Sequence, residues 1–349
     1  MSTLYDFKEN IKKEELKKIA DKINEGGLVV FPTETVYGIG ADATNSKAVK
    51  KIFEAKGRPQ DNPLIVHISN LEMLKDIVYA PTETEKLLMD SFWPGPLTII
   101  LKSKKILPEA VTAKLDTVGV RMPDNDIALN IIEASGKPIA APSANVSGKP
   151  SGTELSDIYN ELKDKVDIFV DGGKTNIGIE STVLKVDENN VVNILRPGKI
   201  SVEDITKIGL EVKLDKHIFE DVKENEKVES PGMKHRHYAP NTKTILLEYS
   251  DEDSIMINKV KEFKRNNENK KIGIICFNEH EEAYKNMGIM CITIGSKSNL
   301  MEISRNVFSD LRKIDDMDLD ICIIEGVKKE YIGTAIMNRL IRACEYKIL

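Results

Sequence analysis

The positions of apolar and polar residues divide the chain into two stretches of short strands and helices. In the first stretch, apolar residues recur at helical spacing over 11–24 and glycines follow at 26 and 27, which predicts a helix that ends there. A second helix is predicted over 46–56, with Ser46 as its N-cap. Short apolar runs predict strands at 28–31, 64–68, 97–101, 118–121, 139–141, 168–171 and 182–186. This pattern predicts an α/β fold, in which helices pack on one large twisted mixed sheet.

The second stretch begins near residue 243 and alternates more regularly. Its apolar runs predict strands at 245–249, 272–277, 291–294 and 321–325, and helices at 254–264, 279–286, 300–313 and 334–344. Strands that alternate with helices in this way predict a small parallel sheet covered by helices, in a Rossmann-like domain. The stretch contains no G-x-G-x-x-G sequence, so a nucleotide-binding role there lacks support.

The segment between the two stretches has a different composition. Residues 216–229 are charged and poor in large apolar side chains, which is typical of a solvated linker. The segment Ser230–Pro240 that follows is too patterned for a spacer, because prolines and a glycine shape it and His235 and Tyr238 add hydrogen-bonding groups. We therefore predict a large α/β domain over 10–205, a linker over 206–242, and a small α/β domain over 243–349.

Composition narrows the class of protein. The chain has 349 residues and a net charge of −6, which argues against a protein that simply coats nucleic acid but leaves a local basic cleft open. We expect no membrane span, because no apolar run approaches the length of about 20 residues that a membrane helix needs. The four cysteines are dispersed, which predicts buried, reduced thiols in a cytoplasmic protein and no metal site.

Two polar segments allow both a structural and a functional interpretation. In Lys56-Gly57-Arg58-Pro59, the residues suit the end of a helix, and spacing alone favours that interpretation, but two cations could also project from the loop toward phosphates. The Ser/Gly/Pro-rich segment 140–152 is either an ordinary loop or a loop whose small residues let backbone N–H groups approach an anion. It is not a Walker A loop, because the glycine spacing is wrong.

Two further candidates are single residues in predicted strands. His67 lies inside an apolar strand, where a lone histidine is more often structural than catalytic. Arg121 ends another apolar strand, and it could form a structural ion pair or bind a substrate carboxylate with its planar fork.

In their order along the chain, these segments resemble the YrdC-like threonylcarbamoyl-AMP synthases, over roughly residues 12 to 200. The resemblance rests on Phe31–Gly40, Lys56-Gly57-Arg58-Pro59, Asn62-Pro63-Leu64, Phe92–Pro96 and Ser143-Ala144-Asn145, which include the Lys-x-Arg and Ser-x-Asn signature. The segments 230–240 and 333–340 resemble the long, two-domain form of that family, although His235 stands where its members are expected to have tyrosine.

The resemblance implies an ATP-dependent nucleotidyltransferase that joins L-threonine, bicarbonate and AMP and releases pyrophosphate. Its Mg²⁺ would arrive with ATP and have no ligands from protein side chains, and no tightly bound organic cofactor is expected. The resemblance also makes 10–205 the catalytic domain and makes 206–242 a linker and active-site lid, and it implies the site residues. The catalytic residues would be Lys56, Arg58, Ser143 and Asn145; ATP would contact Arg58, Asn62, Thr117, Ser143, Ser151 and Arg196; threonine would contact Thr35, His67, Arg121, Ala141 and Ser181.

The implied partner is a downstream tRNA threonylcarbamoyl transferase complex, with a weak contact to tRNA. Two alternatives remain open. An RNA-binding module is disfavoured by the negative net charge. A carbamoyltransferase of the hydrogenase-maturation kind would carry a cysteine-rich zinc segment, whereas this chain has only four scattered cysteines.

Overall fold

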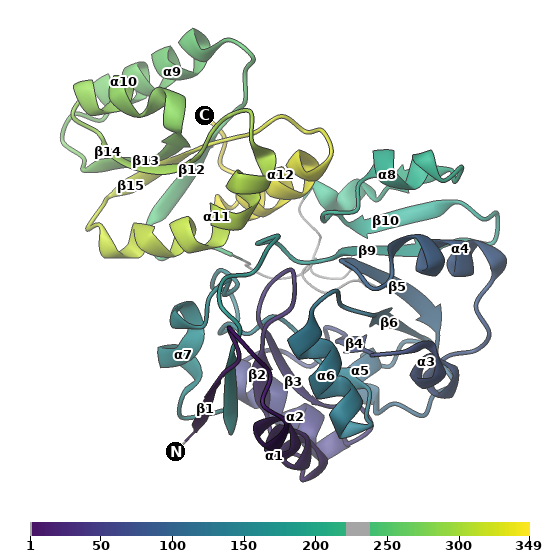
Figure 1. Ribbon diagram of the computed structural model, residues 1–349. Coiled ribbons are helices and arrows are strands. Elements are labelled where there is room, and N and C mark those ends of the chain that lie inside the picture. The colour runs from purple at the N-terminus through teal and green to yellow at the C-terminus, as the bar shows by residue number, and fades with distance from the viewer. Residues whose placement is uncertain (1, 221–237) are drawn as a thin grey trace. The chain divides into compact units, whose positions relative to one another are not determined.

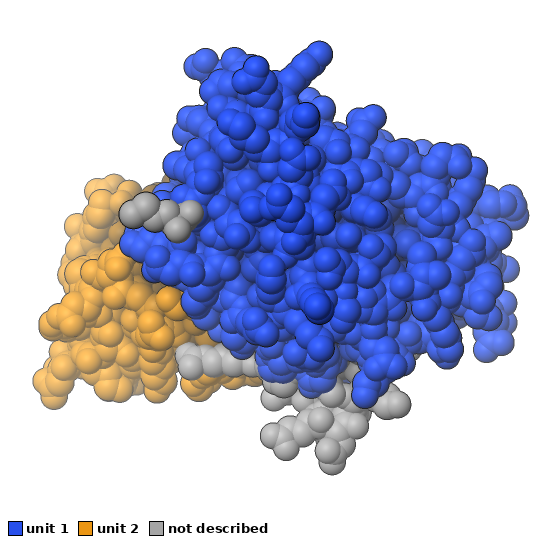
Figure 2. Space-filling model, turned by 90° about the horizontal axis from the view of Figure 1, so that it is seen from below, with its two compact units in different colours: residues 1–147, 151–234 blue, residues 148–150, 235–349 orange. Residues whose placement is uncertain are grey.

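The computed structural model describes residues 2–220 and 238–349. The chain divides into two compact units, which Figure 2 shows in different colours. We call residues 1–147 with 151–234 the large unit, and residues 148–150 with 235–349 the small unit.

The large unit is built on one mixed sheet (Figure 1), to which eleven strands contribute among the described residues. These strands are β1 (Thr3–Asp6), β2 (Val29–Phe31), β3 (Gly38–Asp42), β4 (Ile65–His67), β5 (Leu97–Lys102), β6 (Thr117–Arg121), β7 (Ile139–Ala140), β8 (Ile168–Asp171), β9 (Thr182–Val186), β10 (Val192–Arg196) and β11 (Val212–Leu214). Their order across the sheet is β1-β8-β2-β3-β7-β4-β6-β5-β9-β10-β11. Strands distant in the sequence are therefore neighbours, and β4 runs parallel to β6 with His67 opposite Arg121.

Helices cover both faces of this sheet because successive strand residues point to opposite sides. Val29 and Phe31 pack with the α1 and α6 residues on one face, whereas Val30 belongs to the core on the other face, which includes α2, α3, α4 and α7 residues. The helices of the unit are α1 (Lys13–Asn24), α2 (Ser46–Lys56), α3 (Leu71–Ile77), α4 (Glu83–Phe92), α5 (Glu109–Thr112), α6 (Asp126–Ser135), α7 (Ser156–Leu162) and α8 (Val202–Lys207), with the 3₁₀ turn η1 (Lys216–Ile218).

The small unit is a four-stranded parallel sheet with the order β12-β15-β13-β14. Its strands are β12 (Lys243–Leu247), β13 (Ile272–Phe277), β14 (Met290–Gly295) and β15 (Ile321–Glu325). Its helices are α9 (Asp253–Arg265), α10 (Glu281–Asn286), α11 (Leu300–Lys313) and α12 (Ile332–Ala343), with the 3₁₀ turns η2 (Asn278–His280) and η3 (Ile314–Asp316). The predicted fold class, a large mixed sheet plus a small parallel-sheet domain, is confirmed.

Two details differ from the sequence-based prediction. The N-cap of α2 is Asn45 and not Ser46, because the Asn45 side chain accepts hydrogen bonds from the backbone N–H groups of Lys47 and Ala48. The prediction also missed strands β1, β3, β10 and β11. β3 contains two glycines, and β1 and β11 are short and mostly exposed, so none of them has the apolar run by which strands were recognised.

Among the described residues, no helix is both long and apolar enough to cross a membrane. The structure also shows the environment of the four cysteines, which are all free. Cys276, Cys322 and Cys344 are buried and Cys291 is half-buried, and burial raises the pKa of each thiol.

Candidate functional site

Backbone hydrogen bonds join loops of the large unit that are far apart in the sequence. The loop after β2 is connected to the Ser-x-Asn loop by a 2.7 Å hydrogen bond from the Ala144 N–H to the Tyr37 carbonyl. It is connected to the segment before β9 by a 3.1 Å hydrogen bond from the Gly178 N–H to the Thr35 carbonyl. Together with the carboxyl ends of β4 and β6, these loops carry most of the predicted site residues, so the fold brings them to one region of the sheet.

The Lys-x-Arg and Ser-x-Asn segments meet through one buried amine. The Lys56 Nζ donates hydrogen bonds to the carbonyl of Ser143, to the carbonyl of Asn145 at 2.5 Å and to Asn145 Oδ1 at 3.4 Å. Ser143 Oγ donates to Asn145 Oδ1 at 2.6 Å. Burial, with a smaller contribution from the nearby Arg58 charge, lowers the pKa of Lys56 well below its usual value. Gly57 also ends α2 in the left-handed conformation, which agrees with the structural interpretation of this segment as a helix end.

Arg121 lies at the carboxyl end of β6 and is 4 % exposed. Its Nη1 donates to Thr35 Oγ1 at 3.0 Å and its Nε donates to the Gly95 carbonyl at 3.3 Å. Its Nη2 lies 2.5 Å from Glu34 Oε2, but this contact lacks hydrogen-bond geometry, so Nη2 has no hydrogen-bond acceptor among the described residues. The guanidinium is therefore fixed on two sides, and its Nη2 group is left to donate to a ligand.

His67 lies opposite Arg121 in the sheet, and Ala141 lies beside β4. His67 is buried, and its Nδ1 has no hydrogen-bond partner among the described residues. Burial, assisted by the positive charge of Arg121, lowers the pKa of His67 to about 3, so the imidazole is neutral at physiological pH. The Ala141 N–H donates to the Ile65 carbonyl at 3.0 Å, which keeps the chain beside β4 after β7 has ended.

Two further pairs of site residues are joined by side-chain hydrogen bonds. Arg196 donates from Nη2 to Ser181 Oγ and from Nε to the Ser181 carbonyl, both at 3.1 Å. Ser151 Oγ donates to Glu180 Oε1 at 2.6 Å. The predicted ATP residues Arg196 and Ser151 are thus bound to residues 180–181, which precede β9 and include the predicted threonine residue Ser181.

Asn62 and Thr117 lie elsewhere on the sheet. Asn62 precedes β4 and Thr117 begins β6, whereas His67 and Arg121 are at the carboxyl ends of the same two parallel strands. Thr117 and Arg121 are four positions apart along β6, which is about 13 Å at the usual rise per residue. Among the described residues, the buried Asn62 Oδ1 also has no hydrogen-bond partner. These two predicted ATP residues therefore lie toward the other ends of β4 and β6, away from Arg121.

The predicted lid falls mostly outside the described residues. His235 and His237 belong to the segment 221–237, which the structure does not describe. Tyr238 is 5 % exposed and belongs to the small unit, where its ring stacks on Phe308 with the centroids 5.1 Å apart. The Arg339 guanidinium lies 5.9 Å from the centre of the Tyr238 ring. The role of this segment as a lid stays a prediction.

Two buried carboxylates near the site were not anticipated from the sequence. Glu34 is beside Arg121, and Glu180 accepts the hydrogen bond from Ser151. Glu34 is a charged residue within the mostly apolar segment 28–40, where carboxylates are unusual. This feature of the sequence could have identified it. Nothing comparable marks Glu180.

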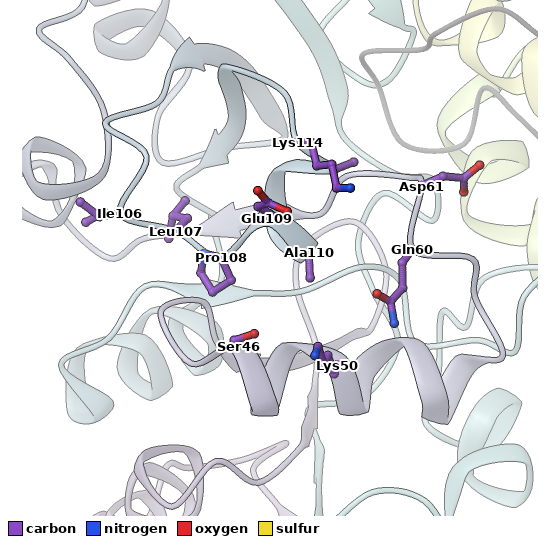
Figure 3. A pocket seen from close by; sticks show the side chains of 11 residues that line it. Ser46, Lys50, Gln60, Asp61, Ile106, Leu107, Pro108, Glu109, Ala110 and Lys114 are labelled. Atoms are coloured by element: carbon purple, nitrogen blue, oxygen red, sulfur yellow. The ribbon is translucent and has the colours of Figure 1, made fainter.

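The described residues contain no group of three or more His, Cys, Asp or Glu side chains that could hold a metal ion. A surface cavity of about 800 Å³ lies beside the outer side of α2 (Figure 3). Gln60 and Asp61, which line it, belong to the same loop as Arg58 and Asn62, and Ser46 and Lys50 come from α2. None of the predicted site residues lines this cavity, so the cavity lies outside the predicted site.

Comparisons with known proteins cover the whole chain. A family model described as "Telomere recombination" (Sua5, YciO and YrdC) matches residues 21–198, and one described as "Threonylcarbamoyl-AMP synthase, C-terminal domain" matches residues 200–344. The threonylcarbamoyl-AMP synthase of Pyrococcus abyssi is 41 % identical over 100 % of this chain and 99 % of its own length. That of Bacillus subtilis is 41 % identical over 96 % of this chain and 94 % of its own length.

A solved structure gives the same result for the fold. The crystal structure of P. abyssi Sua5 complexed with L-threonine superposes with a TM-score of 0.90, at 40 % identity, over 100 % of this chain and 99 % of that one. Both the sequence and the architecture of the two units are therefore shared with these relatives, and the chain belongs to the threonylcarbamoyl-AMP synthase family.

Proposed function

We propose that this protein forms threonylcarbamoyl-AMP and pyrophosphate from L-threonine, bicarbonate and ATP. The proposal is supported by relatives with this name that are 41 % identical over nearly their full length. The observation that carries it most directly is the buried Arg121 guanidinium, whose Nη2 has no hydrogen-bond acceptor among the described residues. A buried donor of this kind is costly unless a ligand supplies the acceptor, and a carboxylate matches the guanidinium fork.

Threonine would therefore bind with its carboxylate on Arg121. Thr35 Oγ1 already accepts a hydrogen bond from Arg121 Nη1 and fixes the plane of the guanidinium. The neutral His67 and the Ser181 hydroxyl offer hydrogen bonds to the polar parts of the amino acid without adding charge. Because P. abyssi Sua5 has been crystallised with L-threonine, we extend threonine binding to this chain.

The reaction then needs two bond-forming steps. The threonine amine attacks bicarbonate, or CO₂ derived from it, and forms a carbamate. A carbamate oxygen then attacks the α-phosphorus of ATP, and pyrophosphate leaves. Neither step requires a covalent enzyme intermediate, so the contribution of the protein is to hold the reactants together and to stabilise developing negative charge.

Lys56 and Arg58 divide this work in our proposal. The Lys56 amine is occupied by the carbonyls of Ser143 and Asn145, so it holds the Ser-x-Asn loop in place. Arg58 is always charged and carries a planar fork that suits phosphate oxygens. Ser143, Ser151 and Asn145 supply further polar groups for the nucleotide, together with Asn62, Thr117 and Arg196.

Mg²⁺ would enter with ATP. Since the described residues offer no three-ligand cluster, the side chains fit a cation held by phosphate oxygens and water better than a resident metal. That cation would neutralise triphosphate charge. The product is a reactive adenylate, so we place a tRNA threonylcarbamoyl transferase complex downstream and both proteins in the cytoplasm.

One incubation tests the proposal. The purified protein is supplied with ATP, Mg²⁺, labelled bicarbonate and each of several amino acids in turn, and the products are separated. A labelled adenylate that appears only with threonine, in equal amount with pyrophosphate, is the expected result. Release of ADP and phosphate, or a labelled product that does not depend on the amino acid, would refute it.

A further inference from the structure

Glu34 is a buried carboxylate that the reaction as described above does not use. Its side chain is 5 % exposed, and neither of its carboxylate oxygens has a hydrogen-bond partner among the described residues. The backbone around it is held firmly, because the Ile177 N–H donates to the Glu34 carbonyl at 2.9 Å. A buried carboxylate normally accepts several hydrogen bonds, so Glu34 is arranged as an acceptor for something that binds beside Arg121.

The charges in this region limit what that ligand can be. Glu34 and Arg121 already balance each other, since the Arg121 Nη2 and Glu34 Oε2 atoms are 2.5 Å apart. A second carboxylate that bound to Arg121 alone would leave one buried negative charge without a cation, which is strongly unfavourable. An α-amino acid avoids this problem because it is a zwitterion. Its carboxylate can bind Arg121 while its ammonium group, attached to the same carbon, binds Glu34.

We propose that Glu34 binds the α-ammonium group of the substrate and accepts a proton from it during carbamate formation. This inference rests on the proposed function, and it adds a catalytic residue and a basis for amino-acid specificity to that site. His67 cannot pair with the ammonium group in the same way, because burial lowers the pKa of its imidazole and keeps it uncharged.

The proton balance of the step agrees with this role. The ammonium group must lose a proton before its nitrogen lone pair can attack bicarbonate. The N–C bond forms as the bond between the carbonyl carbon and the hydroxyl of bicarbonate breaks. Of the three ammonium protons, one stays on the carbamate nitrogen, one leaves with the hydroxyl as water, and one is transferred to Glu34. Glu34 then releases that proton to solvent before the next turnover.

The simpler alternative is that Glu34 serves only as the counter-ion of Arg121. The two roles predict opposite effects of Glu34→Gln, which keeps the size of the side chain and removes its charge. If Glu34 only competes for Arg121, the variant should bind threonine equally well or more tightly. If Glu34 binds the ammonium group, the variant should bind threonine at least about tenfold more weakly, which is 1.4 kcal/mol.

The test measures binding by calorimetry, without ATP, for L-threonine and for 2,3-dihydroxybutanoate, in which a hydroxyl replaces the amine. The wild-type protein should prefer threonine by at least about tenfold, and Glu34→Gln should lose this preference while ATP affinity is unchanged. Glu34→Asp, which keeps the charge, should retain part of it. An unchanged preference in a folded Glu34→Gln variant, judged by its melting temperature, overturns the inference.

A matched control is Asp42→Asn, which removes a different buried carboxylate of the large unit. Asp42 is 6 % exposed and accepts hydrogen bonds from the backbone N–H and hydroxyl of Thr44. This variant should keep the threonine preference, and its loss would also overturn the inference. Failure of the proposed function is distinguishable, because it would appear as a wild-type protein that binds threonine but releases no pyrophosphate from ATP.

Discussion

In the large unit, the buried carboxylate of Glu34 and the Nη2 of Arg121 lack hydrogen-bond partners among the described residues. In the small unit, the buried carboxylate of Glu325 accepts three hydrogen bonds, from the Tyr284 hydroxyl at 2.6 Å, from His280 Nδ1 at 2.7 Å and from the Phe277 N–H at 2.7 Å. Both carboxylates are almost completely buried. They differ in whether other groups of the protein donate hydrogen bonds to the buried carboxylate.

The positions of the two clusters in their sheets are similar, which makes the difference informative. Arg121 ends β6 and Glu325 ends β15, and in open α/β sheets the carboxyl ends of strands are where ligands commonly bind. Both carboxylate oxygens of Glu325 already accept hydrogen bonds from groups of the small unit, so we interpret this cluster as a structural network. Burial of charge alone therefore does not identify a binding site. Glu34 differs from Glu325 because neither of its carboxylate oxygens accepts a hydrogen bond among the described residues.

The largest expected effect is that of Arg121→Leu on threonine binding. The substitution removes the guanidinium that would bind the substrate carboxylate, and we expect the KM for threonine to rise at least about a hundredfold, since a lost charge-assisted bond costs about 3 kcal/mol. The KM for ATP should change less than about threefold. Steady-state kinetics with each substrate varied in turn measures both values.

A control is needed because Arg121→Leu leaves the Glu34 charge buried without a cation. The double variant Arg121→Leu with Glu34→Gln removes both charges, and it should melt at a higher temperature than the single variant while still failing to bind threonine. Equal effects on threonine and ATP in the double variant would show that Arg121 has a structural role, and would remove the contrast between the two clusters.

The next largest effect concerns stability, and it tests whether the Glu325 cluster of the small unit is structural. Glu325→Gln replaces one acceptor oxygen with an NH₂ donor, which must face the Phe277 N–H or the Tyr284 and His280 donors. We expect the free energy of unfolding of the small unit to fall by about 2 kcal/mol. Urea denaturation measures it, with the exposed Glu248→Gln as the control variant. Normal stability in Glu325→Gln would mean that this network is not structural.

The elements of the fold were largely predictable because their apolar spacing is strong. The helices at 46–56 and 300–313 have the predicted bounds. The missed strand β3 has the sequence GIGAD, and its second glycine is needed because a Cβ at Gly40 would lie 2.6 Å from the Phe31 ring. A close approach between strands of this kind depends on tertiary packing, which the spacing of residues does not contain.

The candidate site was predictable only in part. The resemblance named Lys56, Ser143 and Asn145 together, and the structure joins them through the Lys56 amine. No spacing could pair Glu34 with Arg121, because these residues are far apart in the chain and are joined by the order of strands in the sheet. Whether a buried charge has hydrogen-bond partners is a property of the folded structure and is not visible in the sequence.

A smaller effect is expected from Lys56→Ala and Arg58→Ala. Each should lower kcat/KM at least about tenfold, which corresponds to about 1.4 kcal/mol of transition-state stabilisation. Lys51→Ala is the matched control on the same helix, because the Lys51 Nζ donates only to the Gly26 carbonyl among the contacts described, and its loss should affect stability alone. If the Lys56 and Arg58 variants are less stable but fully active, these residues serve only to end the helix.

The smallest expected effect is a pH dependence in the stability of the small unit. His280 is 1 % exposed and contacts Glu325 through Nδ1 and Asp253 through Nε2, and Asp253 in turn pairs with Lys297. Burial alone would lower the pKa of His280, but the two carboxylates outweigh it and raise the pKa above its ordinary value.

A histidine whose pKa is raised by folding stabilises the folded state fully at pH values below its unfolded pKa of about 6.5. That contribution is lost as the pH rises through the folded pKa. The free energy of unfolding of this unit should therefore decrease with pH above about 6.5, and His280→Asn, which keeps a donor to Glu325 but cannot titrate, should flatten this slope. Urea denaturation at a series of pH values measures both proteins, and a wild-type stability that increases with pH in this range would show that His280 is not held as an imidazolium between the two carboxylates.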